Sequence, residues 1–399
     1  MRSIKYLLFL LLFSPTSFFA ADKPAWTIDY KKLNIPQHPK PVRIGKEVPL
    51  NPGYKVQFSP DNNVLISFWE HRPQTELVTK DSPEKSGTIF VVLLLSRESG
   101  ELIRRIEWPV TGEWRSGPQM SHGSRIYPLP SGGYVGIINR HLQVFDSSFK
   151  VIHNRALEVN EYVGYDLITP LYGQYFVLRF SGYREWRTTE IINSETFEIV
   201  ERLNVKNSII DVWGNRLLGF YTDTDIKKNG YEEKKIGVDL KWNDLGLTQG
   251  GYSEAKYIYN GTIIVTDVAR QSPGRKGFWF TIEEGKKSDP VFKDRLIFKP
   301  SWNTPIIANR VGKESALREA LDLDTPLWIE AYNINTREIV LATKKYTNMV
   351  GHAISPDGNS IAVMTTKKIE LYNVNPQYEI YGLGEVWTGQ NHVDKGLCP

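Results

Sequence analysis

The chain offers few groups whose type and spacing could do chemistry. Its seven histidines stand apart, and none forms the His-x-His or His-Glu-x-x-His spacing that brings metal ligands together. No Gly-x-Ser-x-Gly sequence is present, so the nucleophile elbow of many hydrolases is missing. No glycine-rich phosphate loop occurs, because Pro130-Ser131-Gly132-Gly133 reads as a turn. We therefore expect no catalytic residue, no cofactor and no metal site.

A repeated tripeptide is the best candidate for a binding motif. Glu113-Trp114-Arg115 recurs as Glu185-Trp186-Arg187, and both copies lie in segments that read as loops. Trp and Arg are frequent anchors of protein interfaces. Tyr183 and Arg184 stand beside the second copy. The candidate binding residues are Trp114, Arg115, Tyr183, Trp186 and Arg187. The alternative is that these aromatic side chains pack between neighbouring structural units.

Composition and charge indicate a globular β protein. The 399 residues are 41% hydrophobic, 24% charged and 12% aromatic, with 31 Gly and 23 Pro. These values exclude wholesale disorder, and the wealth of aromatic residues favours strands over helices. The net charge is +4 and no run of five basic residues occurs, so we expect no nucleic-acid partner.

The first 21 residues read as a secretory signal peptide. Arg2 and Lys5 precede the apolar run Tyr6–Phe13, and cleavage is expected near Ala20 or Ala21. An uncleaved anchor is the alternative, but the run is short for crossing ~30 Å of hydrocarbon. No later apolar run is long enough to span a membrane, and Cys398 is the single cysteine, so no internal disulfide forms. We expect export to the periplasm or the medium.

The rest of the chain divides into three parts. Residues 22–53 are rich in proline and read as an extended segment, in which Val42–Val48 is a candidate for a strand that closes the last repeat. Residues 54–381 repeat a common unit, and residues 382–399 form a C-terminal tail.

The repeated unit consists of two successive hairpins. The first turn is clearest in Ser59-Pro60-Asp61-Asn62 and Ser355-Pro356-Asp357-Gly358, where Pro fixes φ and Asn or Gly tolerates positive φ. The second hairpin has the shape strand, polar turn, strand, as in Ile329–Leu341 and Ile369–Ile380. Two hairpins make a four-stranded antiparallel sheet, and repetition every ~35–50 residues predicts a propeller or a solenoid. The seven expected blades lie near residues 55–107, 124–158, 165–203, 208–240, 256–300, 304–342 and 348–381, with six or eight blades as alternatives.

These repeats resemble the WD-repeat and TolB-like family of β-propellers. The resemblance rests on the two Ser-Pro-Asp turns and on the third strands Ile329–Ile334 and Ile369–Val374. It covers most of residues 54–381, although no Trp-Asp pair ends a third strand. The resemblance implies an all-β fold, a single propeller of about seven four-stranded antiparallel blades.

Three functions stay open on the sequence. The first is an exported, non-catalytic scaffold that binds another protein of the cell envelope or extracellular space, since the usual use of a propeller's loop faces is to hold a protein. The second is an enzyme, a hydrolase, lyase or quinone-linked dehydrogenase with a site in the central channel. The third is carbohydrate binding. His352 is the candidate for a channel ligand or base, because it lies on an expected first strand; a buried, hydrogen-bonded histidine is the alternative.

Overall fold

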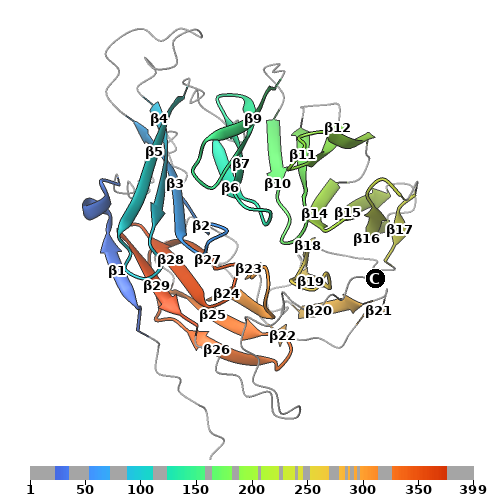
Figure 1. Cartoon of the computed structure of the whole chain (residues 1–399). Helices are drawn as coiled ribbons and strands as arrows, with labels where there is room; N and C mark the ends of the chain where they lie inside the picture. Colours follow the sequence, from blue (N-terminus) through green and yellow to red (C-terminus); the bar gives the residue numbers. More distant parts are fainter. Residues whose placement is uncertain are drawn as a thin grey trace, which may run out of the picture.

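Antiparallel sheets of consecutive strands are arranged in a ring (Figure 1). The computed structural model describes residues 23–35, 54–71, 88–110, 124–157, 164–181, 188–204, 208–223, 228–238, 241–245, 252–268, 278–283, 286–287, 292–293, 297–312 and 326–374. Within these residues there are seven sheets, six of four strands and one of five. The expected propeller is therefore confirmed, and we number its blades 1 to 7 in chain order.

Blades 1 to 3 are built from strands that follow one another directly in the sequence. Blade 1 contains β2 (Lys55–Phe58), β3 (Val64–His71), β4 (Thr88–Leu95) and β5 (Leu102–Val110). Blade 2 contains β6 (Arg125–Pro128), β7 (Tyr134–Ile138), β8 (His141–Phe145) and β9 (Val151–Ala156). Blade 3 contains β10 (Gly164–Ile168), β11 (Tyr175–Ser181), β12 (Thr188–Asn193) and β13 (Ile199–Asn204).

Blades 4 to 6 continue the same order. Blade 4 contains β14 (Ser208–Trp213), β15 (Arg216–Asp223), β16 (Lys228–Lys235) and β17 (Asn243–Asp244). Blade 5 contains β18 (Tyr252–Tyr257), β19 (Ile263–Val268), β20 (Phe278–Glu283), β21 (Lys286–Lys287) and β22 (Phe292–Lys293). Blade 6 contains β23 (Ile297–Pro300), β24 (Ile306–Gly312), β25 (Leu327–Asn333) and β26 (Glu338–Ala342).

One expected blade boundary was wrong. We expected residues 256–300 to form the fifth blade and the sixth to begin near residue 304. Instead β23 pairs with β24, so Ile297–Pro300 opens blade 6. The reason is that Ser301–Pro305 forms the turn of this first hairpin, with Ser301 N–H donating to the Ile306 carbonyl at 3.0 Å. The sequence of this turn is equally typical of a linker between two blades.

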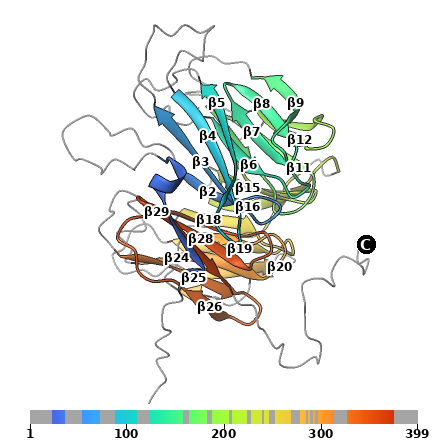
Figure 2. The ribbon, with the colours of Figure 1, turned by 60° about the vertical axis from the view of Figure 1, so that its left-hand side comes forward.

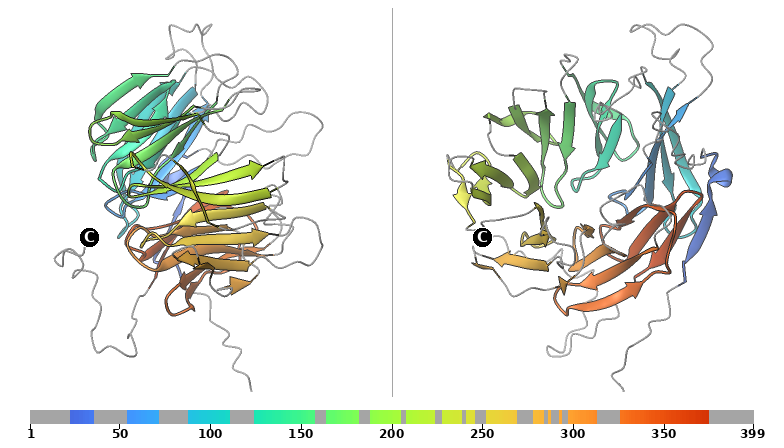
Figure 3. Two further views of the ribbon diagram at one scale, coloured as in Figure 1. Left: turned by 90° about the vertical axis from the view of Figure 1, so that its right-hand side faces the viewer. Right: turned by 180° about the vertical axis from the view of Figure 1, so that it is seen from behind.

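Blade 7 takes its strands from both ends of the chain. It contains β27 (Met349–Ile354), β28 (Ser360–Thr365), β29 (Lys368–Asn373) and, as its outer strand, β1 (Trp26–Asp29). Figure 1 and the view from behind in Figure 3 show β1 along the outside of β29. The outer strand is thus Trp26–Asp29 and not Val42–Val48, which lies outside the described residues. After β1, the 3-10 turn η1 (Tyr30–Leu33) buries Tyr30 and Leu33 against blades 7 and 1.

The core lies between the blades. Seven clusters of buried apolar residues are present in the described residues, and each joins one pair of neighbouring blades, including blades 7 and 1. Side chains alternate along a strand, so each blade contributes one face to each of its two neighbours. Figure 2 shows the same packed sheets from another direction. The ring is therefore held by apolar packing at every junction.

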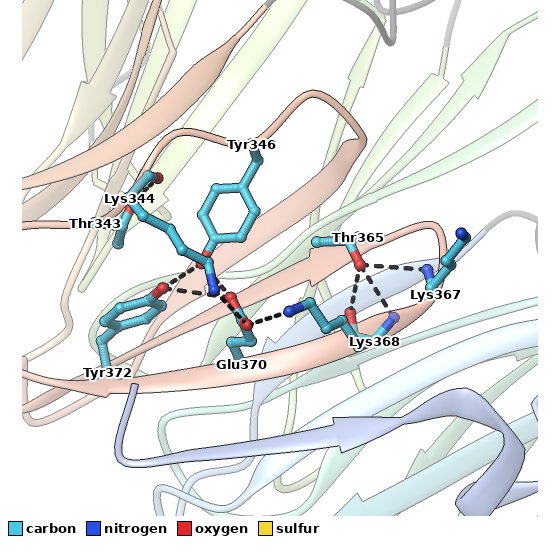
Figure 4. Close-up of polar contacts among 8 residues, drawn as sticks. All are labelled: Thr343, Lys344, Tyr346, Thr365, Lys367, Lys368, Glu370 and Tyr372. Carbon is cyan, nitrogen blue, oxygen red and sulfur yellow. Dashed lines mark hydrogen bonds and ion pairs between the residues drawn. The ribbon is translucent and has the colours of Figure 1, made fainter. Parts of the chain in front are cut away.

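A buried glutamate on β29 joins blades 6 and 7. Glu370 is 1% exposed, and its Oε1 accepts from Lys344 Nζ at 2.8 Å and Lys368 Nζ at 2.6 Å (Figure 4). Its Oε2 accepts from the Tyr346 hydroxyl at 2.5 Å and the Tyr372 hydroxyl at 3.3 Å. Burial alone would raise the pKa of Glu370, but the donated hydrogen bonds outweigh burial and hold the pKa below its ordinary value.

Candidate functional site: an apolar rim on three consecutive blades

The residues predicted to bind a partner lie outside the described residues. Trp114 and Arg115 belong to the connection from β5 to β6, between blades 1 and 2, while Tyr183, Trp186 and Arg187 belong to the connection from β11 to β12, within blade 3. Because consecutive strands are antiparallel, the end of a fourth strand and the end of a second strand open on the same face of the ring. The strands that flank both tripeptides therefore end on one face.

A second feature, on described residues, was not expected from the sequence. Exposed apolar side chains gather at the start of the outer strands β5, β9 and β13. Five of the seven large exposed apolar residues in the described part of the chain lie there, namely Leu102, Ile103, Val151, Ile152 and Val200. We call Ile103, Ile152 and Val200 the apolar rim.

The three rim residues occupy equivalent positions. In each blade the outer strand begins after a polar turn, and its first residue pairs beside a register shift in the third strand. The first residues are Leu102, Val151 and Ile199. The rim residues follow directly, and their exposed fractions are 52% for Ile103, 51% for Ile152 and 43% for Val200. The same environment thus recurs on blades 1, 2 and 3.

The residue that follows each rim residue contacts the next blade. Arg104 donates a hydrogen bond to the Ser148 carbonyl, and the His153 ring lies 3.0 Å from the Glu195 carbonyl through Nε2. The His153 ring also stacks on Phe197, with centroids 5.1 Å apart. Since Arg104 and His153 tie one blade to the next, the rim residues before them are held on a continuous framework.

Glu201 repeats this contact at the junction of blades 3 and 4. Its carboxylate pairs with Lys234 Nζ and accepts from the Gly237 N–H at 3.3 Å. At the junction of blades 2 and 3, Arg155 forms an ion pair with the buried Glu190, with Nη2 and Oε2 2.6 Å apart. Three successive junctions are therefore bridged by polar contacts beside the rim.

The turns that precede the outer strands are rigid. In blade 2, Asp146 Oδ1 accepts from the Ser148 N–H at 2.8 Å and from the Lys150 N–H at 2.9 Å. Hydrogen bonds from the Ser148 hydroxyl and these amides hold the pKa of Asp146 below its ordinary value. In blade 3, Asn193 Oδ1 accepts from the Glu195 N–H at 2.8 Å. Such side-chain turns fix the direction in which each outer strand leaves.

No three His, Cys, Asp or Glu side chains of the described part of the chain lie close enough to hold a metal ion. Within the same residues, no helix is long and apolar enough to cross a membrane.

Comparison with known structures identifies the fold. No protein-family model matches the chain, and no curated protein sequence does. The WD40 domain of Pan2 from Neurospora crassa has a similar structure, with a TM-score of 0.50, 8% sequence identity, and coverage of 89% of this chain and 96% of that domain. The chain has a WD-repeat-like β-propeller fold.

Two further structures are similar to this propeller over most of its length. A chain of the mitotic checkpoint complex gives a TM-score of 0.47 at 11% identity, covering 89% of this chain and 96% of that one. A chain of Kuenenia stuttgartiensis hydrazine synthase gives 0.46 at 10% identity, covering 84% and 99%. At such identities a WD-repeat-like propeller is a statement of fold, and its function depends on its own residues.

Proposed function

We propose that this propeller is an exported, non-catalytic scaffold that binds another protein of the cell envelope or extracellular space. The observation that carries the proposal is the apolar rim, which presents a branched apolar side chain at the same position of three consecutive blades. Apolar surface gains about 25 cal/mol per Å² when it leaves water. A protein partner that spans blades 1 to 3 would cover all three residues at once.

The rim suits protein recognition because it is preorganised. Ile and Val have restricted χ1 rotamers, so they lose little entropy on binding. Within the described sheets no strand pairs with the outer edge of β5, β9 or β13, so a partner strand could add there. Arg104 and His153 supply polar groups directly beside the apolar ones. An apolar centre with a polar surround is the usual anatomy of a protein interface.

The two Glu-Trp-Arg copies extend this proposal to a second region. Their flanking strands end on one face of the ring, whereas the rim follows the turns between third and fourth strands, which open on the other face. Trp114, Arg115, Tyr183, Trp186 and Arg187 are proposed to contact the same partner or a second one. The signal peptide supports export, because it would deliver the mature chain to the compartment where that partner lies.

The test is a cross-linked pull-down of the mature protein from its own cell envelope and medium, compared across variants. Ile103→Asp with Ile152→Asp places charge on the rim, and Trp114→Ala with Trp186→Ala removes the loop anchors. Thr336→Asp is the matched control, since it adds the same charge at an exposed turn of blade 6, away from the rim. We expect a stoichiometric partner that the control retains and the rim variant loses. Equal capture by every variant, all equally stable, would overturn the proposal.

A further inference from the structure

The inner parts of blades 6 and 7 contain buried polar groups that lack hydrogen-bond partners. His352 on β27 is 4% exposed, and neither Nδ1 nor Nε2 has a partner in the described structure. On β24, both amide atoms of Asn309 and the Nε of Arg310 are also buried without one. A buried polar group left unpaired destabilises a fold, so such a concentration calls for an explanation.

The groups near His352 converge from neighbouring strands. Ile354 lies on the same side of β27 as His352 and packs at the junction with blade 6. Arg310 lies on the same side of β24 as Ala308, which packs at this junction. Lys299 of β23 pairs with Ala308, so the Lys299 side chain follows the same face. His352, Arg310 and Lys299 therefore share one junction.

Three basic side chains act on His352. Burial, together with the charges of Arg310, Lys299 and Lys256, holds the pKa of His352 well below its ordinary value, against an opposing contribution from the Ala308 backbone. Burial also lowers the pKa of Arg310. Exposure increases along this group of residues: His352 is buried, Arg310 and Lys256 are half-buried, and Lys299 is exposed.

Polar side chains of blades 1 to 3 show how such groups find hydrogen-bond partners elsewhere in the ring. Gln57 Nε2 donates to the Ile126 carbonyl at 3.0 Å, from blade 1 to blade 2. Arg125 donates to the Tyr165 carbonyl at 2.7 Å, from blade 2 to blade 3. Arg179 donates to the Ile209 carbonyl at 2.8 Å, from blade 3 to blade 4. These three side chains of blades 1 to 3 are thus hydrogen-bonded across their junctions, whereas neither ring nitrogen of His352 makes such a bond in the described structure.

We propose that His352, Arg310 and Lys299, with Lys256 nearby, form a binding site for a small oxyanion at the inner junction of blades 6 and 7. An oxyanion would accept hydrogen bonds from the His352 ring and from Arg310 Nε, the two groups that otherwise lack partners. Phosphate, sulfate and carboxylates share the required acceptor oxygens, so the experiment separates them. This site is independent of the proposed rim.

The test follows thermal stability during titration with inorganic phosphate, sulfate or acetate, against sodium chloride at equal ionic strength. We expect at least one oxyanion to stabilise the wild type more than chloride does. Arg310→Gln and Lys299→Gln should each weaken the apparent affinity about tenfold or more. Arg337→Gln is the matched control, because it removes an equal charge from an exposed turn of the same blade. Lys299 is exposed, so its variant keeps the test valid if Arg310→Gln does not fold.

A second readout follows the His352 ring by NMR, with His352→Asn to assign its signal. Bound oxyanion should raise the pKa of His352, because it stabilises the imidazolium, and the same addition should leave the NMR signal of half-buried His141 on blade 2 unmoved. A wild type that responds to every oxyanion only as it does to chloride would overturn the proposal. So would equal responses of Arg310→Gln, Lys299→Gln and Arg337→Gln, or a His352 pKa that no oxyanion moves.

Discussion

Asn62 and Asp357 join the two clearest copies of the turn motif across the closure of the ring. Asn62 Oδ1 accepts from the Asp357 N–H at 3.1 Å, although the residues are 295 positions apart. The Asp357 carboxylate in turn pairs with Arg97 at 2.5 Å. The motif that repeats in the sequence thus also serves as the contact between blades 1 and 7.

Replacing Asn62 tests this contact. Asn62 has a φ of 61°, which glycine adopts freely, so Asn62→Gly removes the acceptor without straining the turn. We expect a loss of about 1 kcal/mol in the free energy of unfolding. Asn34→Gly, at an exposed site with a φ of 52°, is the control, and urea denaturation of both variants measures the difference. Equal losses would show that the contact across the ring contributes nothing.

Removal of the N-terminal strand should open the ring. A chain that begins at residue 36 lacks β1 together with Tyr30, Leu33 and Ile35, which are buried between blades 7 and 1. The loss of these side chains alone should cost at least ~4 kcal/mol. It also leaves β29 as a free edge, so we expect association in light scattering. A chain that begins at residue 23 is the control, and matching melting temperatures of the two chains would contradict the role of β1.

Gly358 is required for two separate reasons. Its φ is +71°, and a Cβ would lie 2.1 Å from Thr304 Oγ1 in blade 6. Gly237 has a similar φ of +67° but nothing within 4 Å of the Cβ position. Gly237→Ala should therefore cost about 1–2 kcal/mol from backbone strain alone. Gly358→Ala should cost more, as measured by chemical denaturation, and equal costs would mean that Thr304 moves aside freely.

The buried Glu370 predicts a pH dependence of stability. Its pKa is lowered in the folded state, so the stabilisation is present above the unfolded value of about 4.3 and is lost as the pH falls through the folded pKa. Glu370→Gln should lower the free energy of unfolding by about 2 kcal/mol at neutral pH. The gap between wild type and variant should narrow in acid. Glu98→Gln, at an exposed site, is the control; a gap that is constant with pH would contradict the assignment.

Local features of the fold could be predicted from the sequence. The Ser-Pro-Asp turns specify their own hairpins: Ser59 N–H donates to the Asn63 carbonyl at 2.8 Å, and Ser355 N–H to the Ser360 carbonyl at 2.9 Å. The third strands around Glu330 and Glu370 were also predicted, because each is a strand-forming run that leads through a polar turn into a further strand. His352 lies on a first strand, as expected.

Features that depend on partners far away in the sequence could not be predicted. Trp26–Asp29 is only four residues long, and what makes it a strand is its pairing with β29 at the other end of the chain. The rim was missed because Ile103 and its equivalents look like ordinary strand residues. They are exposed because no described strand pairs outside the fourth strand. The recurrence of an apolar pair after each polar turn was nevertheless visible in the sequence. The surroundings of His352 could not be predicted either, because they are made by residues of three other strands.

Because blade 7 takes strands from both ends of the chain, it can form only after the other blades. Tyr30 donates to the Thr365 carbonyl from 335 residues away, so this junction has the largest loop-closure entropy in the ring. Blades 1 to 6 pair only strands that are near in sequence and can form as the chain emerges. The junction of blades 7 and 1 must wait for the last strands to be made. Until then β1 has no partner, and the propeller is an open stack with two unprotected ends.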